Sequence, residues 1–131
     1  MMAEPFDGKS ILVVDDDSDI LSAIEMALQE QGAEIMTAAD GATATNLANE
    51  QSPDLLVLDA MLPQRSGFLV LEKLKAKKPR GGKPYVIMIT ANTGKRHQVW
   101  AESLGADDYI NKPFRMERLV ESARNLLGKD S

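Results

Sequence analysis

Cysteine is missing from this chain of 131 residues, which also has a single histidine and only 5% aromatic residues. Without cysteine the chain can form no disulfide, no thiolate zinc site and no cysteine nucleophile. No apolar run approaches the ~20 residues of a membrane-spanning helix. The first residues lack the basic start and apolar middle of a secretory signal peptide. We therefore expect a cytoplasmic protein that does not associate with a membrane.

Basic residues are outnumbered, with 15 Lys and Arg against 20 Asp and Glu, so the formal net charge is −5. The phosphate groups of nucleic acids and anionic membranes repel a domain of this charge. The length suits one compact domain, and the hydrophobic share of 44% is typical of a globular one. We expect a single domain with no direct binding to nucleic acid.

Two apolar patterns alternate along the chain. Short β-branched runs predict five strands, at residues 10–14, 34–38, 55–58, 84–89 and 108–111. Apolar residues between and after these runs recur at helical spacing and predict five helices. The first and third runs are apolar throughout, which is typical of strands covered on both faces of a parallel sheet. This order predicts one α/β domain with a central parallel sheet.

The predicted domain occupies residues 10–128, between an N-terminal tail (1–9) and a C-terminal tail (129–131). The last helix is predicted to end at Leu127, so we expect no output domain after it, whether the chain works alone or was cut from a longer protein. The basic stretch from Lys75 to Lys83 contains Gly and Pro, and it is typical of an exposed loop.

Charged and hydroxyl side chains follow four of the predicted strands: Asp15, Asp16 and Asp17 after the first, Asp59 after the third, Thr90 after the fourth and Lys112 after the fifth. The carboxyl ends of parallel strands lie at one edge of the sheet, where ligands bind in such folds. Asp15, Asp16 and Asp59 carry −3 and Lys112 carries +1, which leaves −2. One divalent cation would neutralise that charge, and oxygen ligands without His or Cys favour Mg²⁺.

These residue types suit phosphoryl transfer. A carboxylate beside Mg²⁺ can attack a phosphoryl group and form an aspartyl phosphate. The metal and Lys112 would neutralise the transferred oxygens, and Thr90 would donate a hydrogen bond to one of them.

The chain resembles the receiver domains of bacterial two-component response regulators, and its extent is similar to that of the single-domain chemotaxis regulators. The matching segments are 11–16, 54–63 with Gly67, 87–91 and 105–114. They span the chain from the first strand to the final helix. The presence of all four segments in this order is highly specific to receiver domains. The resemblance implies a flavodoxin-like, doubly wound sheet of five parallel strands in the order 2-1-3-4-5, flanked by five helices.

The resemblance also implies roles for the residues at the strand ends. Asp59 matches the phosphoacceptor, and Asp16 and Asp59 would bind Mg²⁺ or Mn²⁺ through their side chains. The backbone carbonyl of Met61 would be a further ligand, and Asp15 would help through water. Lys112 would pair with the phosphoryl group, and its bond to Pro113 is expected to be cis, a geometry that proline makes accessible.

A second set of positions matches the switch of the family. The resemblance implies that the hydroxyl of Thr90 moves toward the phosphoryl group and that the ring of Tyr109 follows it inward. Ala91 matches the small residue that leaves the acyl phosphate accessible. Met61 and Asn92 match the positions that tune the dephosphorylation rate.

The implied function is a signalling switch, not a classical enzyme, because the domain would catalyse only its own phosphorylation and dephosphorylation. A sensor histidine kinase or a phosphotransfer protein would donate the phosphoryl group. A downstream protein would bind the face built from the fourth helix, fifth strand and fifth helix, and a phosphorylation-dependent homodimer through the fourth-helix face is a further candidate.

Other readings of the same residues stay open. Asp15, Asp17 and Asp19 resemble the opening motif of haloacid-dehalogenase-type phosphotransferases, in which case Asp15 would be the nucleophile. An electron-transfer flavodoxin would share the fold and the acidity, but its phosphate loop would stand where this chain has carboxylates. The triplet at residues 8–10 resembles the tail of a P-loop, yet it precedes its strand.

The remaining polar and aromatic residues have structural expectations. Asp17 is expected to cap the first helix, whereas Arg115 replaces the capping residue often found before the last one. His97 lies in a polar stretch, where a solvated position is expected in place of a phosphodonor role. Trp100 is expected to be half-buried.

Overall fold

The structure is a computed structural model that describes residues 5–62, 66–75, 83–91 and 94–128. In this part of the chain five strands alternate with five helices: β1 (Ser10–Val14), α1 (Ser18–Gln29), β2 (Glu34–Ala38), α2 (Gly41–Gln51), β3 (Leu55–Asp59), α3 (Gly67–Lys75), β4 (Tyr85–Thr90), α4 (Lys95–Ser103), β5 (Asp108–Asn111) and α5 (Met116–Leu127). All strand pairs are parallel, and the order is β2-β1-β3-β4-β5. The predicted doubly wound fold is confirmed.

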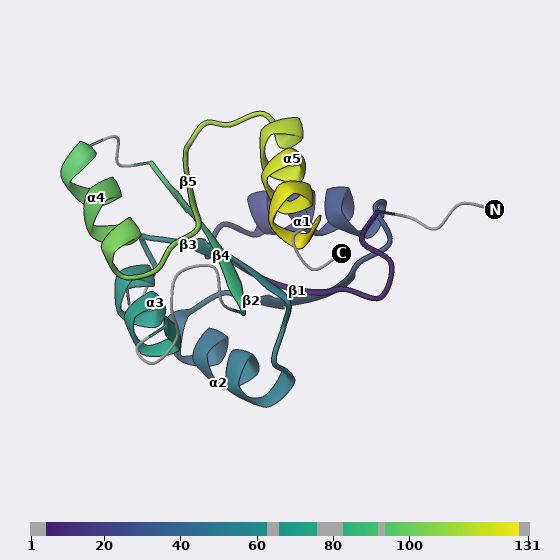
Figure 1. Cartoon of the computed structure of the whole chain (residues 1–131), viewed down its shortest axis with the longest axis horizontal. Coiled ribbons are helices and arrows are strands. Elements are labelled where there is room, and N and C mark those ends of the chain that lie inside the picture. Colours follow the sequence, from purple (N-terminus) through teal and green to yellow (C-terminus); the bar gives the residue numbers. More distant parts are fainter. Residues whose placement is uncertain (1–4, 63–65, 76–82, 92–93, 129–131) are drawn as a thin grey trace.

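The sheet separates two helical layers (Figure 1). Helices α1 and α5 pack on one face, where Ile24, Leu28 and Leu119 join side chains from the strands. Helices α2, α3 and α4 cover the other face, where Ala44 and Phe68 belong to a second apolar cluster. Because both faces are covered, β1 and β3 can be apolar at successive positions, as the sequence indicates.

Side-chain caps fix where two helices begin. Asp17 accepts hydrogen bonds from the backbone N–H groups of Asp19 and Ile20, and Asp40 accepts one from that of Thr43. These bonds satisfy donors that have no partner within a helix. The predicted cap by Asp17 is confirmed, and α5 begins after Arg115 without a side-chain cap.

Several expectations about the periphery need correction. Phe6, from the predicted N-terminal tail, is buried in the core, and its N–H donates to the carbonyl of Gln31. Lys75, assigned to an exposed loop, is instead the buried last residue of α3, with its ammonium 3.6 Å from Asp107. Residues 76–82 of that predicted loop lie outside the described residues. His97, expected to be solvated, is partly buried against Phe68. The expectation for Trp100 is confirmed, because it is half-buried, at 47% exposure.

Among the described residues, no helix combines the length and the apolar character needed to cross a membrane. This agrees with the absence of long apolar runs from the sequence.

Candidate functional site at the carboxyl edge of the sheet

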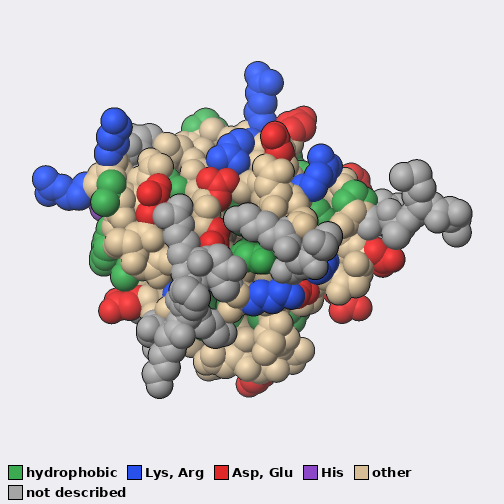
Figure 2. All heavy atoms as spheres, in the orientation of Figure 1, with side chains coloured by type: hydrophobic (Ala, Val, Ile, Leu, Met, Phe, Trp, Pro, Cys, Tyr) green, Lys and Arg blue, Asp and Glu red, His purple; other side chains and the backbone are tan. Residues whose placement is uncertain are grey.

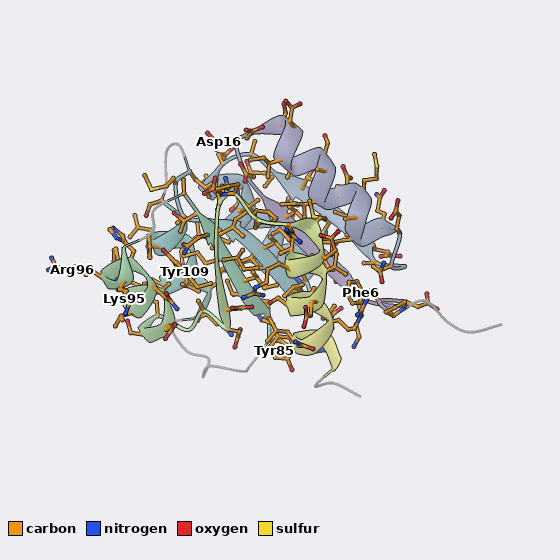
Figure 3. The ribbon with its side chains drawn as sticks, turned by 90° about the horizontal axis from the view of Figure 1, so that it is seen from above. Phe6, Asp16, Tyr85, Lys95, Arg96 and Tyr109 are labelled. Atoms are coloured by element: carbon orange, nitrogen blue, oxygen red, sulfur yellow. The ribbon has the colours of Figure 1, made fainter. Side chains whose placement is uncertain are left out.

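Three carboxylates meet at the carboxyl edge of the sheet. Asp15 directly follows β1, Asp59 is the last residue of β3, and both are buried, whereas Asp16 is exposed. Each offers one oxygen, and these oxygens lie within 4.8 Å of one another. Figure 3 shows Asp16 at this edge, near the start of α1. The sequence prediction that these three side chains converge is correct.

Lys112 reaches the same point from the end of β5. Its ammonium Nζ donates to Asp15 at 3.0 Å and to Asp59 at 3.3 Å. The backbone N–H of Lys112 donates to the carbonyl of Thr90 at 2.7 Å, which ties the residue to the end of β4. The Lys112–Pro113 peptide bond is cis, and so is Lys83–Pro84, which the sequence analysis did not anticipate.

The charges at this edge change two pKa values. Burial and the negative charge of Asp15 raise the pKa of Asp59, although the N–H of Met61 and the ammonium of Lys112 act in the opposite direction. Burial alone would lower the pKa of Lys112, but hydrogen bonding to Asp15 and the two nearby carboxylates outweigh it and raise that pKa. Lys112 therefore stays protonated between two carboxylates that repel each other.

Backbone groups orient the two buried carboxylates. The N–H of Asp17 donates to Asp15 at 2.9 Å, and the N–H of Met61 donates to Asp59 at 3.0 Å. With the bonds from Lys112, both oxygens of each carboxylate are held. The side chains of Asp15 and Asp59 thus have defined positions before any ligand binds.

Gly67 explains how α3 begins so close to Asp59. A Cβ on Gly67 would lie 2.2 Å from the carbonyl oxygen of Asp59, and the N–H of Gly67 donates to Ala60 at 3.0 Å. Only glycine permits this approach. Gly67 belongs to one of the sequence motifs, but its steric role depends on a three-dimensional contact that the sequence does not show.

Thr90, at the end of β4, and Tyr109, in β5, form a buried pair. Both residues are buried, and their side chains are joined by a hydrogen bond. Burial raises the pKa of Tyr109, and the bond from Thr90 partly offsets this effect. Tyr109 lies on the side of the sheet that α4 covers (Figure 3).

Two of the three flanking positions belong to the described residues. Ala91 and Met61 are exposed beside the edge, and Asn92 lies outside the described residues.

An apolar pocket of about 380 Å³ also adjoins Lys112, between α1 and the segment that leads into α5. Its lining includes Ile20, Phe114 and Met116, none of which the sequence analysis assigned to the site.

The donor set fits a hard divalent cation. It offers carboxylate oxygens from Asp15, Asp16 and Asp59, with no nitrogen or sulfur ligand. One ammonium offsets only part of the triple negative charge, so a cation would relieve the remaining repulsion. Such oxygens suit Mg²⁺ or Mn²⁺ better than zinc or copper.

The chain belongs to the response regulator receiver domain family, whose model matches residues 11–124. Receiver domains are phosphorylation-activated switches in two-component signalling, not classical enzymes. Histidine kinases phosphorylate response regulators, which act on downstream effectors. Membership supports neither a dehalogenase-type phosphotransferase nor a flavodoxin.

Individual relatives agree with this assignment. The chain is 42% identical over 118 residues to the probable transcriptional regulatory protein TcrX of Mycobacterium tuberculosis, and covers 49% of it with 90% of its own length. The receiver domain of Francisella response regulator 1452 superposes with a TM-score of 0.86 at 28% identity, over 95% of this chain and all (100%) of that one. The BeF3-activated receiver domain of DrrB gives 0.82 at 32% identity, over 92% and 97%. The chain therefore spans about half of the length of the curated relatives that it matches.

Proposed function

We propose that this chain is a switch that accepts a phosphoryl group on Asp59 with the help of Mg²⁺ and then alters a protein-binding face. The observation that carries the proposal is the placement of Asp59 at 3.3 Å from the ammonium of Lys112, within a cluster of three carboxylates. The buried Thr90–Tyr109 pair is connected to the cluster through Lys112, whose backbone N–H donates to the carbonyl of Thr90.

Of the three acidic residues, Asp59 would be the nucleophile, and Asp15 and Asp16 would help to bind the metal ion. Asp16 and Asp59 would hold Mg²⁺ directly, with the backbone carbonyl of Met61 as a further ligand and Asp15 acting through water. When bound, the cation would neutralise developing negative charge on the phosphoryl oxygens. Asp15 also keeps Lys112 at the site, through the 3.0 Å bond to its ammonium.

The transfer step forms one bond and breaks one. A carboxylate oxygen of Asp59 attacks the phosphorus of a phosphohistidine, the P–N bond breaks, and the imidazole of the donor leaves with the electron pair. Lys112 then pairs with an oxygen of the phosphoryl group, and Thr90 donates a hydrogen bond to another. Water later hydrolyses the acyl phosphate. The small side chain of Ala91 would leave the acyl phosphate open to solvent, and Met61 and Asn92 would tune the rate of this hydrolysis.

The hydroxyl of Thr90 connects phosphorylation to the switch. It bonds to Tyr109 in this structure, so a hydrogen bond from Thr90 to the phosphoryl group competes with the bond to the phenol. The ring of Tyr109 would then repack beneath α4, and the response would appear on the face formed by α4, β5 and α5.

The outer surface of α4 suits a protein partner. Val99 and Trp100 are large exposed apolar residues, at 64% and 47%, and Lys95 and Arg96 are exposed beside them. Basic and hydrophobic side chains gather over α4 at the left of Figure 2, and Arg96 points away from the domain in Figure 3. A downstream protein or, after phosphorylation, a second copy of the chain would bind here.

Phosphorylation of the purified chain tests the proposal. Incubation with acetyl phosphate and Mg²⁺ is expected to add one phosphoryl group, which peptide mass mapping locates on Asp59. The label should be absent without Mg²⁺ and from the Asp59→Asn variant. A label on Asp15 would instead favour the dehalogenase-type mechanism and contradict this proposal.

A further inference from the structure

Helix α4 is the least anchored of the helices in the described part of the chain. All nine of its residues are described, and only Ala101 is buried. By comparison, α3, also of nine residues, buries five, and α5 buries five of twelve. Gly94, the residue just before the helix, provides no side-chain cap. The position of α4 therefore depends on few contacts.

An aromatic stack joins α3 and α4. The rings of Phe68 and Trp100 are nearly parallel, at 6°, with centroids 4.4 Å apart. His97, one helical turn before Trp100, places its ring 5.9 Å from the same phenylalanine. Phe68 is buried and Trp100 is half exposed, so the stack joins the apolar core to the outer surface of α4.

On the α3 side, the stack lies next to the proposed phosphoacceptor, Asp59. Phe68 directly follows Gly67, which lies against the backbone of Asp59 and Ala60 with no room for a Cβ. The N–H of Gly67 donates to Ala60, and the side chain of Asp59 is held by the N–H of Met61. A displacement of the backbone at Asp59 or Ala60 would move the start of α3 and the ring of Phe68 with it.

We propose that the Phe68–Trp100 stack transmits the state of Asp59 to α4, so that both residues are positioning residues of the switch. The inference rests on the proposed phosphorylation of Asp59. It adds a route through α3 that is separate from the Thr90–Tyr109 pair, which reaches α4 through β4 and β5. Because packed elements adopt discrete arrangements, a small shift at Gly67 can move a helix that has few other contacts.

Trp100 is the single tryptophan of the chain, so tryptophan emission reports this position alone. Beryllofluoride with Mg²⁺, an analogue of the acyl phosphate, is expected to change the emission of the wild-type chain. In Phe68→Leu that change should be lost. Phe6→Leu is the matched control, because it makes the same substitution at a buried residue on the other face of the sheet.

Coupling between two sites is reciprocal, so breaking the stack must also change the affinity for beryllofluoride. Calorimetry is expected to give a change of about fivefold or more for Phe68→Leu and for Trp100→Leu. Trp100→Phe retains a ring and should keep the wild-type affinity. Trp100 is half exposed, so its variants are expected to fold even if Phe68→Leu does not.

Two results would overturn the inference. One is binding of beryllofluoride to the wild-type chain without any change in tryptophan emission. The other is an affinity change of less than fivefold in Trp100→Leu. A wild-type chain that neither binds beryllofluoride nor becomes labelled on Asp59 would contradict the proposed function itself, and the mass measurement distinguishes that failure from the first two.

Discussion

At the scale of single residues, Lys112 has the most varied task. Its ammonium is shared between Asp15 and Asp59, at 3.0 and 3.3 Å, and in the proposed mechanism it pairs with the phosphoryl group after transfer. A lysine suits this task because it carries a compact charge on a flexible stem. The same ammonium also competes with a metal ion for the carboxylates.

Replacing Lys112 by alanine should separate metal binding from signalling. Loss of the positive charge makes the site more negative, so Lys112→Ala is expected to bind Mg²⁺ at least as tightly as the wild type, by calorimetry. Asp59 should still become labelled, more slowly, but beryllofluoride should no longer change the tryptophan emission. Lys83→Ala, which removes a lysine from the opposite edge of the sheet, serves as the control. A wild-type emission response in Lys112→Ala would contradict the role given to the ammonium.

The repulsion between Asp15 and Asp59 should be visible in stability. Burial and the charge of Asp15 disfavour ionised Asp59 and raise its pKa. Near pH 7 without metal, Asp59→Asn is therefore expected to melt roughly 2–5 °C higher, or ~1 kcal/mol for a domain of this length. Added Mg²⁺ should stabilise the wild type more than the variant. Calorimetric melting with and without Mg²⁺ measures both effects, and equal gains from Mg²⁺ would exclude Asp59 as a ligand.

At the scale of elements, the ends of the strands and the starts of the helices position the residues of the site. Three strands and their following residues deliver Asp15, Asp59 and Lys112 to one edge, and the start of α3 closes against Asp59. The sequence predicted the strands within one residue because a short run with β-branched residues marks each of them. It predicted the cap at Asp17 because local hydrogen bonding decides such positions.

Contacts between distant elements were less predictable. The burial of Lys75 depends on Asp107, 32 positions further along the chain, and a basic residue before a Gly- and Pro-rich stretch has no local sign of such a partner. The contact of Phe68 with Trp100 likewise depends on how α3 and α4 lie together. Periodicity predicts which face of a helix is buried, but not which side chain it meets.

The start of α3 should tolerate no side chain. Gly67→Ala would place a Cβ 2.2 Å from the carbonyl oxygen of Asp59, so a loss of about 2–3 kcal/mol in unfolding free energy is expected, together with slower labelling of Asp59. Urea titration and the labelling rate measure the two effects. Gly128→Ala is the control, because a Cβ there has no atom within 4 Å. Equal stabilities of the two variants would contradict the close approach.

The junction of β5 and α5 should give the chain an acid-sensitive contact. Burial alone would raise the pKa of Asp108, but hydrogen bonds from Arg118, Ser122 and the N–H of Tyr109 outweigh it, and the pKa is lowered. A carboxyl group with a lowered pKa in the folded state stabilises the fold above its unfolded pKa, near 3.9. That contribution is lost as the pH falls through the folded value.

Asp108→Asn tests this dependence. Wild-type stability is expected to fall as the pH drops below about 4, and the variant should show a shallower fall over the same range, because asparagine does not titrate. Urea unfolding at steps from neutral to acidic pH measures the slope. Glu50→Gln, which alters an exposed carboxylate on α2, should keep the wild-type slope. A wild-type slope in Asp108→Asn would show that Asp108 does not carry the effect.

At the scale of the whole molecule, a single sheet has an apolar core on each of its two faces and the charged cluster at its carboxyl edge. The cluster under α1 and α5 and the cluster under α2, α3 and α4 are separated by the strands. The alternation of strands and helices predicted a central parallel sheet, whereas the doubly wound strand order was implied by the resemblance to receiver domains. The inclusion of Phe6 could not, since a single aromatic residue in a short N-terminal stretch has no periodicity to indicate burial.

Because α4 buries few side chains, it should unfold locally more often than the other helices. Helices with few buried side chains open locally at lower cost than the rest of the fold, and their amide protons exchange with solvent sooner. The amides of α4 should therefore exchange before those of α3 and α5. A ligand at the charged edge that tightens the Phe68–Trp100 contact would slow this exchange. The amide exchange rate of α4 would then report the state of Asp59.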